Sequence, residues 1–242
     1  MFHFKQFSVD DSLCGMKIGT DAVLLGAVAA RYRSVKVLDI GTGCGIIALM
    51  IAQKGGDIIY AIDADQQTCQ QAMQNFARSP WRNKFNVIDE SLQYFGSNFH
   101  SFRFDLIVCN PPYFINSTPS PNDLRNKARH NNSLSYIHIF QYASKLISDQ
   151  GKLLMIFPAS HQKMLDEYAS QKSFFNSRNI FIHPAPGHLP KRIIAEYSKQ
   201  KPAFLKSESL TIRTPSRNEF TSEYQQLTNA YHPFFPDQDE KV

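Results

Sequence analysis

The amino-acid sequence predicts an α/β fold built on a doubly wound, mainly parallel sheet. Short apolar, β-branched runs alternate with stretches of helical periodicity over the first two-thirds of the chain, which is typical of strands joined by crossover helices. The run Leu106–Val108 is apolar at every position, as expected for a central strand covered by helices on both faces. Beyond residue 175 three more apolar runs follow, with no long helix between the last two. These runs predict an antiparallel C-terminal edge of the sheet.

The predicted elements follow one another in regular order. Strands are expected at 35–40, 58–62, 85–88, 104–109, 151–157, 179–182, 193–197 and 210–213. Helices are expected at 20–33, with Thr20 as N-cap, at 46–54, and on the apolar stripes Cys69/Ala72/Met73/Phe76, Tyr136–Ile147 and Tyr224/Leu227/Tyr231. Because no segment has the composition of a linker, we expect one domain over residues 1–242. It would have an N-terminal arm at 1–19 and C-terminal strands and a tail at 175–242.

Composition and charge narrow the class of protein. The chain has 242 residues, of which 43% are apolar and 19% charged, as in a soluble globular domain. Its longest dense apolar stretch, Ala22–Ala30, is far shorter than the ~20 residues of a membrane-spanning helix. The four cysteines form no CxxC pair and the eight histidines show no metal-ligand spacing, so we expect no metal and a reducing, cytoplasmic location. The net charge of +5 suits a polyanionic partner.

A glycine-rich turn follows the first predicted strand of the sheet. Gly41, Gly43 and Gly45 have the spacing G-x-G-x-G, which differs from the G-x-G-x-x-G of dinucleotide-binding folds. Such glycines let a ligand press against the backbone while helix N–H groups point at its negative part. With no diphosphate to hold, the compact loop favours the methionine end of S-adenosylmethionine, its ammonium hydrogen-bonded to Asp39. Asp63 ends the next strand, near the ~20-residue spacing of an acid that binds ribose hydroxyls.

The sequence Asn110-Pro111-Pro112-Tyr113 stands at the C-terminal end of the strand predicted at 104–109, where a doubly wound sheet opens its ligand crevice. An adenine amino nitrogen is a poor nucleophile because its lone pair is delocalised into the ring. The side-chain carbonyl of Asn110, with a main-chain carbonyl kept rigid by Pro111, can accept both amino hydrogens and let the nitrogen become tetrahedral. Tyr113 offers an aromatic face for an extruded base. The motif therefore predicts methylation of a base amino group.

Together these motifs resemble the class I S-adenosylmethionine methyltransferases that methylate amino groups and carry NPPY on a Rossmann-like fold. Phe4–Phe7 (FKQF) and Met16–Ala27 (MKIGTDAVLLGA) are further similar to the N-terminal signature of the bacterial valine-tRNA (adenine-37-N6) methyltransferases. The resemblance implies an enzyme of tRNA modification. It would transfer a methyl group from S-adenosylmethionine to the N6 amino group of the adenine on the 3′ side of the anticodon.

The resemblance also implies roles for residues outside the two motifs. Gly19, Thr20 and Asp21 would border the methionine end of the cofactor. Near the cofactor adenine the family has an acid, and this chain reads Asp89-Glu90-Ser91. Ser91 stands at the most obvious aligned position, and Asp89 takes the role if the register shifts slightly.

Two basic segments are expected to contact RNA. The segment 116–133 contains Arg125, Lys127 and Arg129, and a loop of this length often serves as a lid or binding loop. The second is a cluster suited to phosphate contact, made up of Lys191, Arg192, Lys199, Lys201 and Lys206.

Other functions stay open at this point. NPPY also serves methylation of adenine in DNA, guanine in ribosomal RNA or glutamine side chains in proteins. A non-catalytic RNA-binding module on the same fold is a further alternative, although it has no need of Asn110 or of an intact glycine loop. A nicotinamide-dependent dehydrogenase is disfavoured by the loop spacing.

Overall fold

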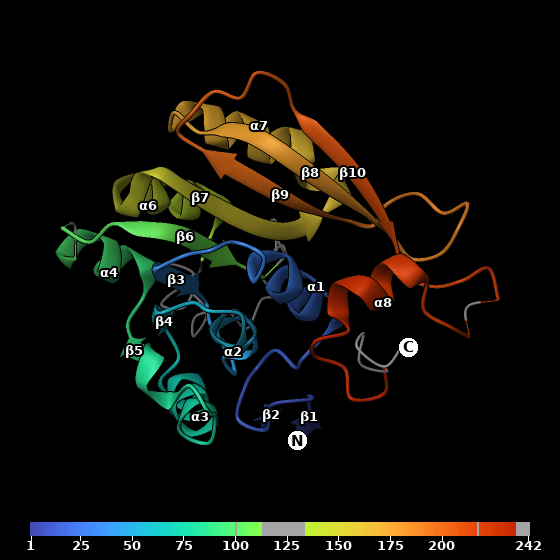
Figure 1. Ribbon diagram of the computed structural model, residues 1–242. Coiled ribbons are helices and arrows are strands. Elements are labelled where there is room, and N and C mark those ends of the chain that lie inside the picture. Colours follow the sequence, from blue (N-terminus) through green and yellow to red (C-terminus); the bar gives the residue numbers. More distant parts are fainter. Residues whose placement is uncertain (100, 113–133, 217, 236–242) are drawn as a thin grey trace, which may run out of the picture.

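The protein is described from a computed structural model, which describes residues 1–99, 101–112, 134–216 and 218–235. Within these ranges the main sheet has eight strands in the order β10-β8-β9-β7-β6-β3-β4-β5 (Figure 1). Their bounds are β3 Lys36–Ile40, β4 Ile58–Asp63, β5 Phe85–Asp89, β6 Phe104–Cys109, β7 Ile147–Pro158, β8 Phe175–His183, β9 Arg192–Ser198 and β10 Lys206–Thr211. The predicted α/β fold with a mainly parallel sheet is confirmed.

The antiparallel part of the sheet consists of one strand. β9 runs antiparallel to both of its neighbours, β7 and β8, whereas the edge strand β10 is parallel to β8. This arrangement arises because the crossover from β7 to β8 leaves one position open, and the turn after β8 returns the chain into it. The sequence predicted the reversal in this C-terminal segment but placed it at the edge, and the structure places it two positions in from the edge strand β10.

Helices cover both faces of the sheet, as Figure 1 shows. One face packs against α1 (Thr20–Ala29), α2 (Ile46–Gln53), α3 (Gln66–Ala77) and α8 (Ser222–Thr228). The other packs against α4 (Leu92–Asn98), α6 (Tyr136–Leu146) and α7 (Gln162–Gln171). Two short 3₁₀ helices, η1 (Arg82–Lys84) and η2 (Ala159–His161), complete these connections. Successive strand residues alternate between the faces: Val37 belongs to the first core, and Leu38 and Ile40 to the second.

Some predicted boundaries differ from the observed ones. The first long helix ends at Ala29, and Gly19 is its N-cap, so Thr20 is the first helical residue and the N-cap role predicted for it is wrong. Met73 is 48% exposed, which leaves Cys69, Ala72 and Phe76 as the buried stripe of α3. Helices α4 and α7 were not predicted. No helix within the described residues has the length and apolarity that a membrane crossing requires.

The N-terminal arm forms a small hairpin and is fastened to α3. Strands β1 (Phe2–His3) and β2 (Ser8–Val9) pair antiparallel. The Asn75 side chain then accepts from the Asp10 N–H at 3.0 Å and donates to the Asp10 carbonyl at 2.8 Å. The same amide donates to the carbonyl of Cys44 at 2.8 Å. One side chain of α3 therefore joins the arm to the glycine loop.

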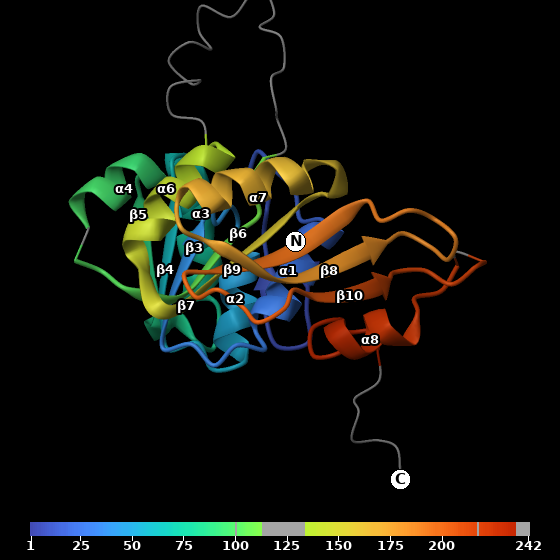
Figure 2. The same cartoon turned by 90° about the horizontal axis from the view of Figure 1, so that it is seen from above.

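β5 and α4 lie at one end of the molecule, and β8, β10 and α8 at the other (Figure 2).

Candidate active site

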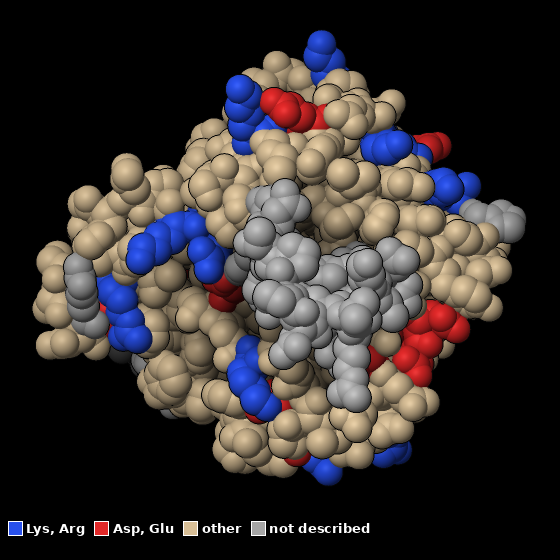
Figure 3. Space-filling view, turned by 180° about the vertical axis from the view of Figure 1, so that it is seen from behind, with Lys and Arg blue, Asp and Glu red and all other residues tan. Residues whose placement is uncertain are grey.

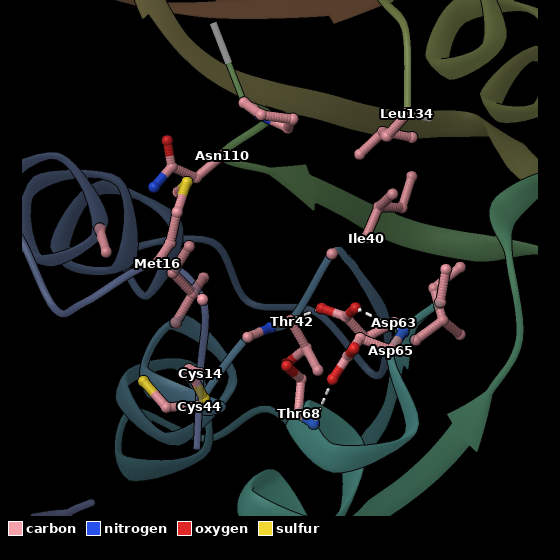
Figure 4. Close-up of a pocket in the computed structure, with 18 of the residues that line it drawn as sticks. Cys14, Met16, Ile40, Thr42, Cys44, Asp63, Asp65, Thr68, Asn110 and Leu134 are labelled. Carbon is pink, nitrogen blue, oxygen red and sulfur yellow. Dashed lines mark hydrogen bonds between the residues drawn. The ribbon is translucent and has the colours of Figure 1, made fainter. Parts of the chain in front are cut away.

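A cavity of about 740 Å³ opens at the carboxyl ends of the central strands (Figure 4). Four segments form its walls: the N-terminal arm, the glycine loop after β3, the turn from β4 into α3, and the turn from β5 into α4. The end of β6 closes it. The lining residues that matter below are Cys14, Met16, Lys17, Gly41, Thr42, Gly43, Cys44, Asp63, Thr68, Glu90, Ser91, Asn110 and Leu134.

The glycine loop has a backbone that only glycine adopts without strain. The φ angles of Gly41, Gly43 and Gly45 are 67°, 58° and 83°, in the left-handed region. A methyl group added at Gly43 would meet no atom within 4 Å, because this glycine faces the cavity. Gly45 does not line the cavity; a methyl group there would lie 2.4 Å from the Phe76 ring. Gly41 and Gly43 therefore leave room for a ligand, whereas Gly45 leaves room for α3.

Asp63 lies at the end of β4 and lines the cavity, as predicted for a ribose-binding acid. Its two carboxylate oxygens accept from the Gly43 N–H at 3.0 Å and from the Asp65 N–H at 3.1 Å. Burial raises the pKa of this carboxyl, and these main-chain donors oppose the rise. Asp65 caps α3 by accepting from the Thr68 N–H at 2.8 Å. The Asp63 carboxylate is thus fixed next to the glycine loop, whose shape it stabilises.

Asp39 lies beneath the glycine loop. The side chain is fully buried and does not line the cavity, and burial raises its pKa to about 7. The Thr42 hydroxyl donates to this carboxylate at 2.8 Å, and Thr42 is the residue that reaches the cavity. Thr42 therefore lies between Asp39 and the cavity, and the contact between Asp39 and an ammonium group stays a prediction. The sequence did not single out Thr42, since a threonine between two glycines has no pattern of its own.

Asn110 follows the last residue of β6 and lines the cavity together with Pro112, while Pro111 is buried behind them. Figure 4 shows the Asn110 side chain near Met16, on the opposite side of the cavity from Asp63 and Thr68. The NPPY asparagine and the glycine loop therefore share one cavity. Tyr113, Arg125, Lys127 and Arg129 lie outside the described residues.

Of the residues Gly19, Thr20 and Asp21, none lines the cavity. The arm residues just before them do, including Met16 and Lys17. The Lys17 ammonium donates to the carbonyls of Asp11 at 2.7 Å and Ser12 at 3.2 Å, which ties this part of the arm into a turn. The sequence placed 16–21 within one signature, but it contained no signal that 16–18, rather than 19–21, line the cavity.

At the opposite wall the structure separates Asp89 from Ser91. Asp89 is exposed at the end of β5 and does not line the cavity, and its role near the cofactor adenine stays a prediction. Glu90 and Ser91 do line it. The Ser91 hydroxyl caps α4 by accepting from the Tyr94 N–H at 3.2 Å, because the chain turns into a helix at this point. The acidic side chain nearest to this wall belongs to Glu90.

The predicted basic cluster does not hold together in space. Lys191 and Arg192 lie at the start of β9, at the carboxyl edge of the parallel strands. Lys199 and Lys201 follow the far end of β9, about 20 Å away for a strand of this length. Lys206 pairs with Glu208 at 2.6 Å. The cluster was expected from proximity in sequence, but an intervening strand carries its two halves to opposite edges of the sheet.

Arg192 has a specific partner near the site. Its guanidinium pairs with the Asp21 carboxylate at 2.9 Å, so a residue predicted to touch cofactor and one predicted to touch RNA bind each other. Lys191 is exposed beside this pair. Figure 3 shows Lys and Arg side chains at several separate places around this face of the molecule, not in one patch. Among the described residues no group of three or more His, Cys, Asp or Glu is arranged to hold a metal ion.

The fold and this cavity define a class I methyltransferase, and the family model of the methyltransferase small domain matches residues 14–178. Among solved structures, a predicted O-methyltransferase from Agrobacterium tumefaciens has a TM-score of 0.65 at 16% identity, covering 90% of this chain and 100% of that one. The ribosomal protein L11 methylase of Lactobacillus delbrueckii subsp. bulgaricus has a TM-score of 0.56 at 16% identity, with coverages of 79% and 84%. These two similarities support the fold.

Sequence relatives identify the family more closely. The tRNA1(Val) (adenine(37)-N6)-methyltransferase of Parabacteroides distasonis is 38% identical over 231 residues, covering 96% of this chain and 97% of the relative. The enzyme of the same description from Trichodesmium erythraeum is 38% identical over 234 residues, with the same coverages. The chain belongs to the tRNA1(Val) (adenine(37)-N6)-methyltransferase family, and the resemblance inferred from its motifs is confirmed.

Proposed function

We propose that this protein transfers the methyl group of S-adenosylmethionine to the N6 amino group of adenine 37 in valine tRNA, in the cytoplasm. The observation that carries the proposal is that Asn110 lines the same cavity as Gly43 and Asp63. A donor held by the loop and a base held by the asparagine would meet there. We further propose that residues 1–242 act as one domain, because the sheet that builds the site includes strands from Lys36 to Thr211.

The residues present suit S-adenosylmethionine. Gly41 and Gly43 line the cavity without side chains, and a Cβ at either position would narrow it. The methionine part of S-adenosylmethionine would lie on this side. The Asp63 carboxylate can accept hydrogen bonds from two ribose hydroxyls. Ile62 and Leu92 provide apolar surface beside the turn after β5, which suits the adenine ring. When bound, the sulfonium makes the methyl carbon electrophilic, so the chain itself needs to supply position rather than a nucleophile.

Asn110 would act on the incoming base. Its side-chain oxygen accepts one amino hydrogen, and this draws the lone pair out of conjugation. Bound S-adenosylmethionine would supply the methyl group, and Asn110 would hold the amino nitrogen towards it while that nitrogen gives up a proton to solvent. Positioning of this kind lowers a barrier by roughly 7–11 kcal/mol in favourable cases. Because the target atom is inaccessible in a stacked base, the adenine must turn outward to reach the cavity.

Lys191 is an exposed cation at the same edge of the sheet as Asn110, so we propose that it contacts the anticodon stem. Arg192 is already paired with Asp21, so we propose that it shapes the rim instead. Arg125, Lys127 and Arg129 remain proposals for RNA contact, and Tyr113 for stacking on the target base.

The test offers S-adenosylmethionine labelled in the methyl group to four substrates in parallel. These are a valine tRNA transcript, the same transcript with guanine at position 37, an adenine-containing DNA duplex, and ribosomal RNA with protein. We expect label in the first alone, mapped to N6 of adenine 37. Asn110→Ala should lower the single-turnover rate by about 10²–10³ with donor affinity retained. Label confined to DNA, ribosomal RNA or protein would overturn the tRNA assignment, and an unchanged Asn110→Ala rate would remove this residue from the mechanism.

A further inference from the structure

Two cysteines meet at the wall of the donor cavity. Cys14 belongs to the N-terminal arm and Cys44 to the glycine loop, and each is 4% exposed. Both line the cavity. Figure 4 shows the two side chains next to one another, on the arm and loop side of the cavity. No step of the methyl transfer described above uses either thiol.

The two segments that carry these thiols are held together by α3. The Asn75 amide donates to the carbonyls of both Asp10 and Cys44. The Gln71 side-chain oxygen accepts from the Ser12 hydroxyl at 3.2 Å and from the Leu13 N–H at 3.4 Å. These contacts keep the two cysteine side chains next to each other. Two cysteines held in this way lose little further freedom when they become linked.

The surroundings distinguish the two thiols chemically. The neighbouring Cys44 side chain lowers the pKa of Cys14, an effect that Lys17 assists and that burial and the nearby carboxylates oppose. The pKa of Cys44 is raised, first by the neighbouring Cys14 side chain and then by burial. Because the thiolate is the reactive form, Cys14 is the nucleophile of the pair and Cys44 the resolving thiol.

The remaining cysteines have other partners. The Cys69 thiol donates to the Asp63 carbonyl at 3.4 Å, and burial raises its pKa to about 12. Cys109 is fully buried in the opposite core. Cys69 is therefore a matched control, since it is also buried, also lies near the site, and does not line the cavity.

We propose that Cys14 and Cys44 form a thiol-modification site, at which a peroxide links them in a disulfide that reduces the affinity of the cavity for the methyl donor. The Cys14 thiolate attacks one peroxide oxygen and becomes a sulfenic acid, and the other oxygen leaves as water. The Cys44 thiol then attacks the Cys14 sulfur and displaces a second water. Two thiols and one hydrogen peroxide thus give one disulfide and two waters. Transient disulfides of this kind are the form expected in a reducing compartment.

The link changes the cavity because of where Cys44 lies. A disulfide brings its sulfurs to about 2.05 Å, closer than any hydrogen-bonded thiols. Cys44 lies between Gly43 and Gly45, which both have left-handed φ angles. The disulfide draws the arm towards this loop. The Gly43 N–H, which donates a hydrogen bond to the Asp63 carboxylate, is then displaced from its position. We expect affinity for the donor to fall by at least about tenfold, the equivalent of losing one hydrogen bond of about 1.4 kcal/mol. This part rests on the proposed function.

The experiment treats the full-length, reduced protein with one equivalent of hydrogen peroxide. Intact mass should fall by two hydrogen atoms, and peptide mapping should join the Cys14 peptide to the Cys44 peptide. Titration with S-adenosylhomocysteine should show the weakened affinity, and dithiothreitol should restore it. Cys69→Ser should behave as the unaltered protein, whereas Cys14→Ser and Cys44→Ser should not form the link.

Saturating S-adenosylhomocysteine should slow the oxidation, because it would occupy the cavity through which peroxide reaches the thiols. Absence of a Cys14–Cys44 link under conditions that oxidise a control dithiol would overturn the modification site. A link that leaves the S-adenosylhomocysteine affinity unchanged would overturn its effect on binding. If the reduced protein binds no S-adenosylhomocysteine, the proposed function fails, and the peptide map still decides whether the link forms.

Discussion

Gly45→Ala tests how the glycine loop fits onto α3. The added methyl group would lie 2.4 Å and 2.6 Å from two carbons of the Phe76 ring. That ring is 3% exposed and is stacked on Phe85 at a centroid distance of 3.9 Å, so it cannot turn aside freely. Gly43→Ala is the matched control. It has a similar φ, but nothing lies within 4 Å of the new methyl group.

The two variants should therefore differ in stability. A left-handed alanine costs about 1 kcal/mol, and overpacking a dense core costs a further ~1–3 kcal/mol. Gly45→Ala is expected to lose roughly 2–4 kcal/mol of unfolding free energy, and Gly43→Ala about 1 kcal/mol. At about 2–4 °C per kcal/mol for a chain of this size, Tm should fall by roughly 4–16 °C and 2–4 °C respectively.

Differential scanning calorimetry measures both values, and isothermal titration with S-adenosylhomocysteine completes the comparison. Gly43→Ala should weaken donor binding despite its small effect on Tm, because its methyl group enters the cavity. Equal Tm values for the two variants would refute the idea that Gly45 is required by its contact with Phe76. The loop would then need glycine at this position for its φ angle alone.

Three further predictions concern charged residues. Burial raises the folded-state pKa of Asp39 from 3.8 to about 7, so the folded state binds more protons between these values, and stability falls as pH rises through this window. Urea titrations at several pH values should show a shallower fall in Asp39→Asn, and an unchanged slope would place the titration elsewhere. Asp63→Ala should weaken S-adenosylhomocysteine binding, measured by calorimetry, by about 10–150-fold, because the loss of a charged hydrogen-bond acceptor costs ~1.5–3 kcal/mol. A change below twofold would show that Asp63 does not belong to the donor site. Lys191→Glu should lower tRNA affinity and reduce the slope of log affinity against log salt concentration by about 1. Lys201→Glu, beyond the other end of β9, should change neither the affinity nor the slope. Equal effects of the two variants would mean that neither position is specific to the RNA site.

The sequence predicted the sheet well because burial leaves a pattern that can be read residue by residue. β6 is apolar on both faces and was predicted at its observed limits, 104–109. Helix α7 was missed because only Leu165 and Ala169 of its residues are buried, which is too weak a stripe to recognise. The position of β9 was missed because hydropathy reports that a strand is covered but not which strands lie beside it.

The site was predicted in outline for a related reason. Asn110, Gly43 and Asp63 follow directly after strands, and parallel strands bring their carboxyl ends to one edge. Whether a side chain then faces the ligand depends on local turns that leave no pattern in the sequence. The Asp39 side chain is buried beneath the glycine loop, whereas Thr42 reaches the cavity.

The arm forms part of the wall of the cavity, and this matters for where translation begins. A second methionine, Met16, lies within the arm, and a product initiated there would keep the glycine loop and NPPY intact. It would nevertheless lack Asp10, one of the two carbonyl partners of Asn75, as well as Cys14. Its new ammonium terminus would stand at the mouth of the donor cavity, where Met16 now lies. A shortened protein of this kind would retain the glycine loop and NPPY and still be a defective enzyme.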